Sequence, residues 1–106
     1  MPTGRIRITG NGEFQSSFRV NGPIINIDLL VGNTGGFDCD SLVDESAGFD
    51  LLAGKGDGKT ADTRYTIGDD EATGIPLQFA SGRLTADVSD HTTGEGSIVV
   101  RWRESS

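Results

Sequence analysis

The sequence predicts an all-β fold: a small antiparallel β-sandwich, jelly roll or barrel of about seven or eight short strands, with at most one short helix. Apolar residues alternate with polar ones at a period of two far more often than they recur at helical spacing. Glycine accounts for 16 of the 106 residues and gathers between these alternating segments, where turns are expected. A chain of this length supports one core, so residues 1–106 are expected to form a single β domain.

The first third of the chain predicts a three-stranded meander. In residues 5–8 the isoleucines face one side and the arginines the other, and a polar turn follows at residues 9–12. The next strand covers residues 14–20, and Asn21-Gly22 is expected to form a hairpin turn. Pro23 then opens a third strand, whose inner face lies within residues 25–31.

The middle of the chain leaves two alternatives open. Residues 40–47 form either one short helix, capped by Asp40 or Ser41, or a strand built on Leu42 and Val43. A short strand is expected at residues 49–52, followed by a polar, glycine-rich loop. The remaining strands are expected at residues 63–67, 75–80, 83–88 and 97–103.

The composition argues against several partners and destinations. The formal net charge is -7, and an acidic chain does not coat nucleic acid or anionic lipid unless its few basic residues are concentrated on one face. No apolar run approaches the length of about 18 residues that a membrane helix needs, and the first residues lack the apolar stretch of a signal peptide. Cys39 is the single cysteine, so no intramolecular disulfide forms and synthesis in a reducing cytoplasm is expected.

The motifs that could carry catalysis are unconvincing. Residues 53–60 fit a phosphate-binding P-loop, but the following residues favour a strand over the helix that such a loop requires. No serine lies in a nucleophile pattern, which argues against triad chemistry, and His91, as a lone loop histidine, is expected to be exposed. Cys39 lies between two aspartates, so its pKa is expected to be raised. We therefore expect a protein that is not an enzyme and binds no cofactor.

Two aspartate-rich segments are candidate cation sites. Asp38, Asp40 and Asp44 lie close in sequence, as do the acids at residues 69–71. Neither segment has the spacing of a calcium-binding loop, so solvated loops without metal are expected. An alternative of another class is a carbohydrate-binding or receptor-binding β module, assisted by calcium at one of these segments. The single tryptophan and single tyrosine argue against a sugar-stacking cleft.

The most informative feature is the position of the arginines. Residues 1–20 carry three arginines and one glutamate, net +2, whereas residues 21–90 carry thirteen acids and four basic residues, net -9. If the first and last strands pair, four arginines share one face, and carboxylates of a partner would bind them. The alternative is that the arginines are separate and solvated. The candidate partner-contact residues are Arg5, Arg7, Arg101, Trp102 and Arg103.

The chain resembles the small all-β virion proteins of tailed bacteriophages, above all the capsid decoration or cement proteins. The resemblance rests on residues 4–10, on Asn21-Gly22-Pro23 and on residues 96–103. It implies a non-enzymatic structural protein of the virion, made in the host cytoplasm and located on the capsid surface. The implied partner is the major capsid protein or another virion protein, and the implied state is a homo-oligomer, a trimer or dimer. A head-tail connector or tail component is the nearest alternative.

Overall fold

Seven β-strands and no helix occur in the residues that the computed structural model describes, which are 2–46, 48–58 and 60–104. The strands are β1 (Thr3–Ile8), β2 (Gly12–Leu30), β3 (Asp38–Asp44), β4 (Thr63–Ile67), β5 (Gly74–Ile75), β6 (Phe79–Ser89) and β7 (Gly96–Trp102). The all-β prediction is confirmed. The described residues contain no helix of the length and apolarity that crossing a membrane would require.

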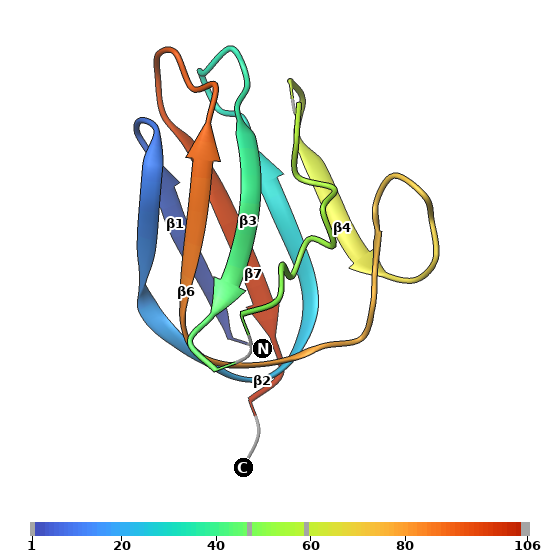
Figure 1. Ribbon diagram of the computed structural model, residues 1–106. Coiled ribbons are helices and arrows are strands. Elements are labelled where there is room, and N and C mark those ends of the chain that lie inside the picture. Colours follow the sequence, from blue (N-terminus) through green and yellow to red (C-terminus); the bar gives the residue numbers. More distant parts are fainter. Residues whose placement is uncertain (1, 47, 59, 105–106) are drawn as a thin grey trace.

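Strand β2 takes part in three ladders and joins two layers. Its first half, residues 12–23, pairs antiparallel with β6, which also pairs with β3. Its second half, residues 24–30, pairs with β7 and β4, and β1 lies on the far side of β7. The short β5 runs parallel to β4. Figure 1 shows β6 and β3 in front of β1 and β7, with β2 passing from one layer to the other.

The core lies between the two layers and follows the alternation in the sequence. Ile6 and Ile8 of β1 are buried beside Ile98 and Val100 of β7, while the residues between them face outward. The layer of β6 contributes Leu84, Ala86 and Val88 in the same way. Because every second residue is apolar, each strand buries one face and leaves the other polar.

The predicted meander is wrong, because β1 pairs with β7 and not with β2. Asn21-Gly22 forms no hairpin turn: the chain continues through it, with Asn21 opposite Ser81 and Gly22 opposite Ala80. Gly22 is buried and has a φ of 155° where β2 leaves the ladder with β6. The Pro23 carbonyl accepts the N–H of Arg103 at 3.0 Å, so the next residues align with β7. Pairing with a second sheet replaces the chain reversal.

The structure decides between the alternatives for the middle of the chain. Residues 38–44 form strand β3, so the alternative built on Leu42 and Val43 is confirmed; Ala47 lies outside the described residues. The strand expected at residues 49–52 is wrong, because residues 51–54 form turns. The carboxylate of Asp50 accepts the N–H groups of Leu42 and Leu52, both at 3.0 Å, and that of Gly54 at 2.7 Å.

The strand expected at residues 75–80 is divided between two strands. Ile75 belongs to β5, which begins one residue earlier at Gly74, and Phe79 and Ala80 belong to β6. Strand β6 starts at Phe79 and runs through Ser81-Gly82, where a connector was expected. Both residues are paired with β2 there.

Residues 50–58 close one side of the molecule. The Cys39 N–H donates to the Gly56 carbonyl at 2.9 Å, so this segment covers the outer edge of β3. The Tyr65 hydroxyl of β4 donates to the Lys55 carbonyl at 2.6 Å. Lys55 Nζ in turn donates to the Gly74 carbonyl at 2.6 Å. The segment therefore ties β3, in one layer, to β4 and β5, in the other.

Candidate interaction surface

The first and last strands pair along their whole length and place arginines on one outer face. Thr3 lies opposite Arg101, Arg5 opposite Val99 and Arg7 opposite Ser97. Directly opposed residues in an antiparallel pair project to the same side, so Arg5, Arg7 and Arg101 share a face. Arg103 follows directly after the end of β7 and is exposed. We call these four residues, Arg5, Arg7, Arg101 and Arg103, the arginine face.

One member of the arginine face is already neutralised. Arg7 binds Glu95 in two-pronged geometry, with Nε at 3.0 Å and Nη2 at 2.8 Å from the two carboxylate oxygens. The hydrogen bonds and the opposite charge raise the pKa of Arg7 and lower the pKa of Glu95. Both side chains are exposed, so solvent screens this pair and its contribution to stability is small.

A second two-pronged pair continues the same outer face onto β2 and β4. Asp28 lies opposite both Val99 of β7 and Arg64 of β4. The guanidinium of Arg64 donates to its two carboxylate oxygens at 2.7 and 2.9 Å, which raises the pKa of Arg64. The acids on this face therefore have arginine partners within the chain.

Three arginines of the face form no ion pair within the described residues, although the charge of Arg5 adds to that of Arg7 in lowering the pKa of Glu95. Within the described residues, the arginine ion pairs involve Arg7, Arg19 and Arg64. Arg5 makes one hydrogen bond, from Nη1 to the Ser97 hydroxyl at 2.9 Å. An arginine has five N–H donors, so the guanidinium of Arg5 keeps capacity for an external carboxylate. Arg5, Arg101 and Arg103 are the groups through which this face can bind an acidic partner.

Trp102 lies inside the protein and not on the arginine face. Its side chain is buried, stacks on Phe18 with ring centroids 5.5 Å apart, and donates from Nε1 to Glu104 at 2.7 Å. Gly4 makes room for this stack, because a Cβ atom there would lie 2.5 Å from the Phe18 ring. Trp102 thus fixes the end of β7, and the exposed arginines alone form the candidate contact surface.

A group of carboxylates lies beside β3, in the other layer. Oxygens of Asp38, Asp40 and Asp57 all lie within 4.8 Å of one another. Burial and the neighbouring carboxylates raise the pKa of Asp57, and a hydrogen bond and charge repulsion from Asp38 raise that of Asp90. Carboxylate oxygens at this spacing are the ligands that a hard divalent cation takes. We call Asp38, Asp40, Asp57 and Asp90 the acidic cluster.

The acidic cluster differs from both aspartate-rich segments of the sequence. Asp44 lies away from it, buried, where its carboxylate accepts the Ser81 N–H at 2.9 Å. Asp57 takes its place because the Gly58 N–H donates to Asp38 and holds that loop against β3. In residues 69–71, Asp70 accepts the N–H groups of Ala72 and Thr73, which lowers its pKa. That segment is a hydrogen-bonded turn.

Cys39, His91 and Lys55, which the sequence offered as possible catalytic residues, are buried or bound by hydrogen bonds to other parts of the chain. Burial is the main cause that raises the pKa of the Cys39 thiol to about 12, so the predicted direction is confirmed and the aspartates are the lesser cause. The prediction of an exposed His91 is wrong. His91 is 7% exposed, and its backbone N–H donates to the side-chain oxygen of Asn11 at 2.8 Å. In the P-loop look-alike, Lys55 binds backbone carbonyls, and Lys59 lies outside the described residues.

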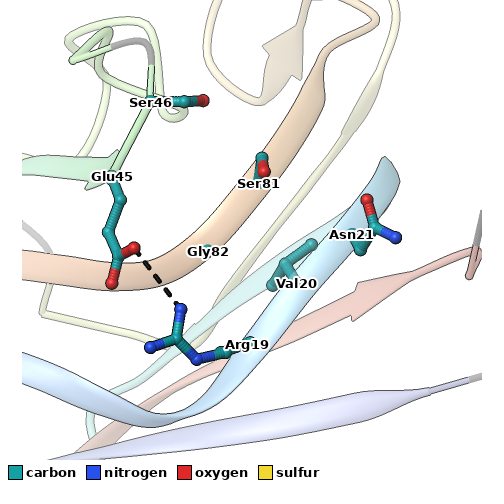
Figure 2. Close-up of a pocket in the computed structure, with 7 residues that line it drawn as sticks. All are labelled: Arg19, Val20, Asn21, Glu45, Ser46, Ser81 and Gly82. Atoms are coloured by element: carbon teal, nitrogen blue, oxygen red, sulfur yellow. Dashed lines mark hydrogen bonds and ion pairs between the residues drawn. The ribbon is translucent and has the colours of Figure 1, made fainter.

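A hollow of about 480 Å³ lies on the outer side of the β2–β6 layer (Figure 2). Arg19 and Glu45 reach toward each other across Gly82, and their ion pair measures 3.4 Å. Gly82 has a φ of 95°, and a Cβ atom there would lie 2.7 Å from the Glu45 carboxylate. The ion pair therefore uses the space that the glycine leaves, and its two charges cancel at this position.

Comparison of the chain with protein-family models, with curated proteins and with solved structures found no match. The candidate function therefore depends on the arginine face and its chemistry.

Proposed function

We propose that this chain is a non-enzymatic structural protein of a tailed-phage virion, of the capsid decoration or cement type, that docks through the arginine face onto acidic surface of the major capsid protein. One observation carries the proposal: Arg5 and Arg101 lie on the outer face of β1 and β7, Arg103 follows directly after β7, and none of the three forms an ion pair within the described residues. In a chain with a net charge of -7, unpaired arginines on one face favour an acidic partner.

The physical gain comes from how arginine binds carboxylate. A guanidinium forms two parallel hydrogen bonds to one carboxylate, as Arg7 and Arg64 already do within the chain. The arginines stand on paired strands, so their backbones are held before binding and less order has to be imposed. Copies held on a lattice add many such contacts, because each further contact within a bound oligomer is effectively intramolecular.

The alternative of a carbohydrate-binding module receives less support from the geometry. Sugar platforms use exposed aromatic rings; Trp102 and Tyr65 are buried, and the exposed rings among the described residues are those of Phe49 and Phe79. A head-tail connector or tail component would use the same arginine face. The copy number per particle separates it from a decoration protein, which occurs in hundreds of copies.

The test uses capsids assembled without this protein. Purified wild-type protein is expected to sediment with them and to raise the temperature at which they open. The variant Arg5→Glu/Arg101→Glu is expected to lose at least about tenfold in affinity, because two hydrogen-bonded charges become repulsive. Arg19→Glu is the matched control, since it reverses the charge of an exposed arginine in the other layer.

The outcomes are distinct. Loss of capsid binding in Arg5→Glu/Arg101→Glu with retention in Arg19→Glu supports docking through the arginine face. Equal binding of both variants removes the arginine face from the proposal. Wild-type protein that neither binds the capsids nor alters their heat stability contradicts the decoration role itself. The mass of the protein in solution tests the proposed trimer or dimer.

A further inference from the structure

One edge of β1 is unpaired and carries free backbone hydrogen-bonding groups. Among the described strands, β1 pairs with β7 alone. The Trp102 N–H donates to the Pro2 carbonyl at 3.2 Å, which makes this a hydrogen-bonded pair of the antiparallel ladder. Such pairs alternate along the ladder. Thr3, Arg5 and Arg7 therefore direct their backbone N–H and C=O groups away from β7, toward the free edge.

A groove runs beside this edge. Strands β1 and β2 are joined by a short turn at residues 9–11, yet they do not pair, because they enter different layers. Between them lies a groove of about 350 Å³, lined by residues 5–7 of β1 and residues 13–17 of β2. Its inner side offers the half-buried Phe14 and its outer side offers Arg5 and Arg7. The groove thus has an apolar wall and a row of backbone groups. Its charged residues are Arg5, Arg7 and Glu13, and Arg7 is already paired with Glu95, so Arg5 is the arginine of the groove that no carboxylate binds within the described residues.

The charges indicate what can occupy the groove. If β1 of a second copy paired antiparallel with this edge around Arg5, arginines would lie directly opposite one another, which is unfavourable. Charged residues on an edge strand commonly prevent such self-pairing. A strand with carboxylates at the same positions reverses the sign, because Arg5 has donors left for them.

We propose that β1 accepts an extended acidic segment of a partner protein as an added antiparallel strand, with an acidic residue opposite Arg5 and the apolar residues next to it facing Phe14. The backbone bonds supply affinity, and the alternation of acidic and apolar side chains supplies specificity. This inference rests on the proposed docking role and names the form in which the partner presents its carboxylates.

The test uses the full chain and a capped seven-residue peptide in which glutamate alternates with valine. On binding, amide hydrogen exchange at Arg5 and Arg7 is expected to slow at least tenfold. The amides of Ile6 and Ile8, which already face β7, are expected to change little. Arg5→Glu is expected to weaken binding at least about tenfold, and Arg19→Glu, in the other layer, to leave it unchanged.

Two further peptides separate strand pairing from charge attraction. N-methylation of the glutamates removes the N–H groups that an antiparallel partner would donate to β1 and leaves the side chains intact. This peptide is expected to lose binding, whereas N-methylation of the valines, whose N–H groups point away from β1, is expected to be tolerated. A peptide with lysine in place of glutamate is expected not to bind.

Several results would overturn the inference. Binding without protection of the Arg5 and Arg7 amides, or equal binding of the glutamate-methylated and parent peptides, would mean that side chains alone hold the partner. That result leaves the proposed decoration role standing. Conversely, protection of these amides by the peptide together with no capsid binding would retain the strand-acceptor edge and contradict the decoration role.

Discussion

At the scale of single residues, the Ser16 side chain accepts a backbone hydrogen bond where β2 changes its register against β6. The register shifts between Gln15 and Arg19, and there the Leu84 N–H donates to the Ser16 hydroxyl at 2.9 Å. Both residues are buried, so Ser16→Ala leaves a buried N–H without its acceptor. We expect the variant to lose about 1–3 kcal/mol in the free energy of unfolding, measured by chemical denaturation.

Ser17→Ala is the matched control for this prediction, because Ser17 is an exposed neighbour in the same bulge. Its unfolding free energy is expected to change by less than about 0.5 kcal/mol. Equal stability of the two variants would show that the hydrogen bond from Leu84 to the Ser16 hydroxyl does not contribute to the stability of the fold.

Gly4 is required by the ring that lies over it. A Cβ atom at this position would lie 2.5 Å from Phe18, which is itself stacked on Trp102. Gly4→Ala is therefore expected to force Phe18 from its position and to cost about 1–3 kcal/mol. Gly10→Ala is the control, since no atom lies within 4 Å of a Cβ atom there. Thermal unfolding that is equal for the two variants would contradict the packing argument.

At this scale the sequence predicts well to which side of a strand each side chain points. It predicts poorly which side chains contact each other within the chain. The alternation places Ile6 inward, Arg5 outward and Trp102 on the inner face, because a strand has a period of two. No local pattern indicates that Glu95 would bind Arg7, since that pair depends on how β1 and β7 are aligned. Asp57 joins Asp38 for the same reason: a loop folds back on a strand.

At the scale of elements, the acidic cluster joins the start of β3 to two loops and opposes its own folding at neutral pH. The pKa of Asp57 is raised in the folded chain by burial and by the nearby carboxylates, most directly Asp40. A raised pKa means that the folded state binds the proton more tightly, so stability falls as the pH rises through the carboxyl range. Asp57→Asn is therefore expected to be more stable than wild type at pH 7.

This gain is expected to disappear as the pH is lowered until Asp57 is protonated in both the folded and the unfolded chain. Asp69→Asn is the control, because it removes the same charge from an exposed loop away from the cluster. The measurement is the difference in melting temperature between each variant and wild type across pH. A gain that equals that of Asp69→Asn at every pH would mean that only net charge matters.

The elements themselves were predictable where alternation is regular and unpredictable where the chain changes layers. Strand β4 matches its predicted residues, 63–67, because the segment is rich in β-branched and aromatic residues. Asn21-Gly22 has the composition of a hairpin turn, but its neighbours pair with β6 and β7, and those partners lie far away in the sequence. Tertiary pairing therefore overrides the local turn preference there.

At the scale of the whole molecule, one outer strand edge of the layered fold is covered by the chain itself and another is open. On one side residues 50–58 cover the edge of β3 and tie the layers together. On the other side the edge of β1 has no strand beside it. Exposed strand edges can pair with other chains. In this fold residues 50–58 cover the edge of β3, whereas the edge of β1 is uncovered and carries arginines.

The covered side depends on Asp50, which accepts the N–H groups of Leu42, Leu52 and Gly54. Asp50→Ala removes both acceptor oxygens and with them three hydrogen bonds, two of which come from the buried residues Leu42 and Leu52. We expect a loss of at least about 2 kcal/mol in unfolding free energy and, because the edge of β3 becomes accessible, concentration-dependent association in light scattering.

Asp50→Asn separates the two causes in this prediction. Its amide oxygen keeps the acceptor that serves Leu42 and Leu52, while the second acceptor, used by Gly54, is lost. The variant is therefore expected to be intermediate in stability and to remain monodisperse in light scattering under conditions where Asp50→Ala associates. If Asp50→Ala unfolds more easily but does not associate, residues 50–58 stabilise the fold without shielding the edge of β3. In that case the argument that uncovered strand edges lead to association would apply only to the open edge of β1.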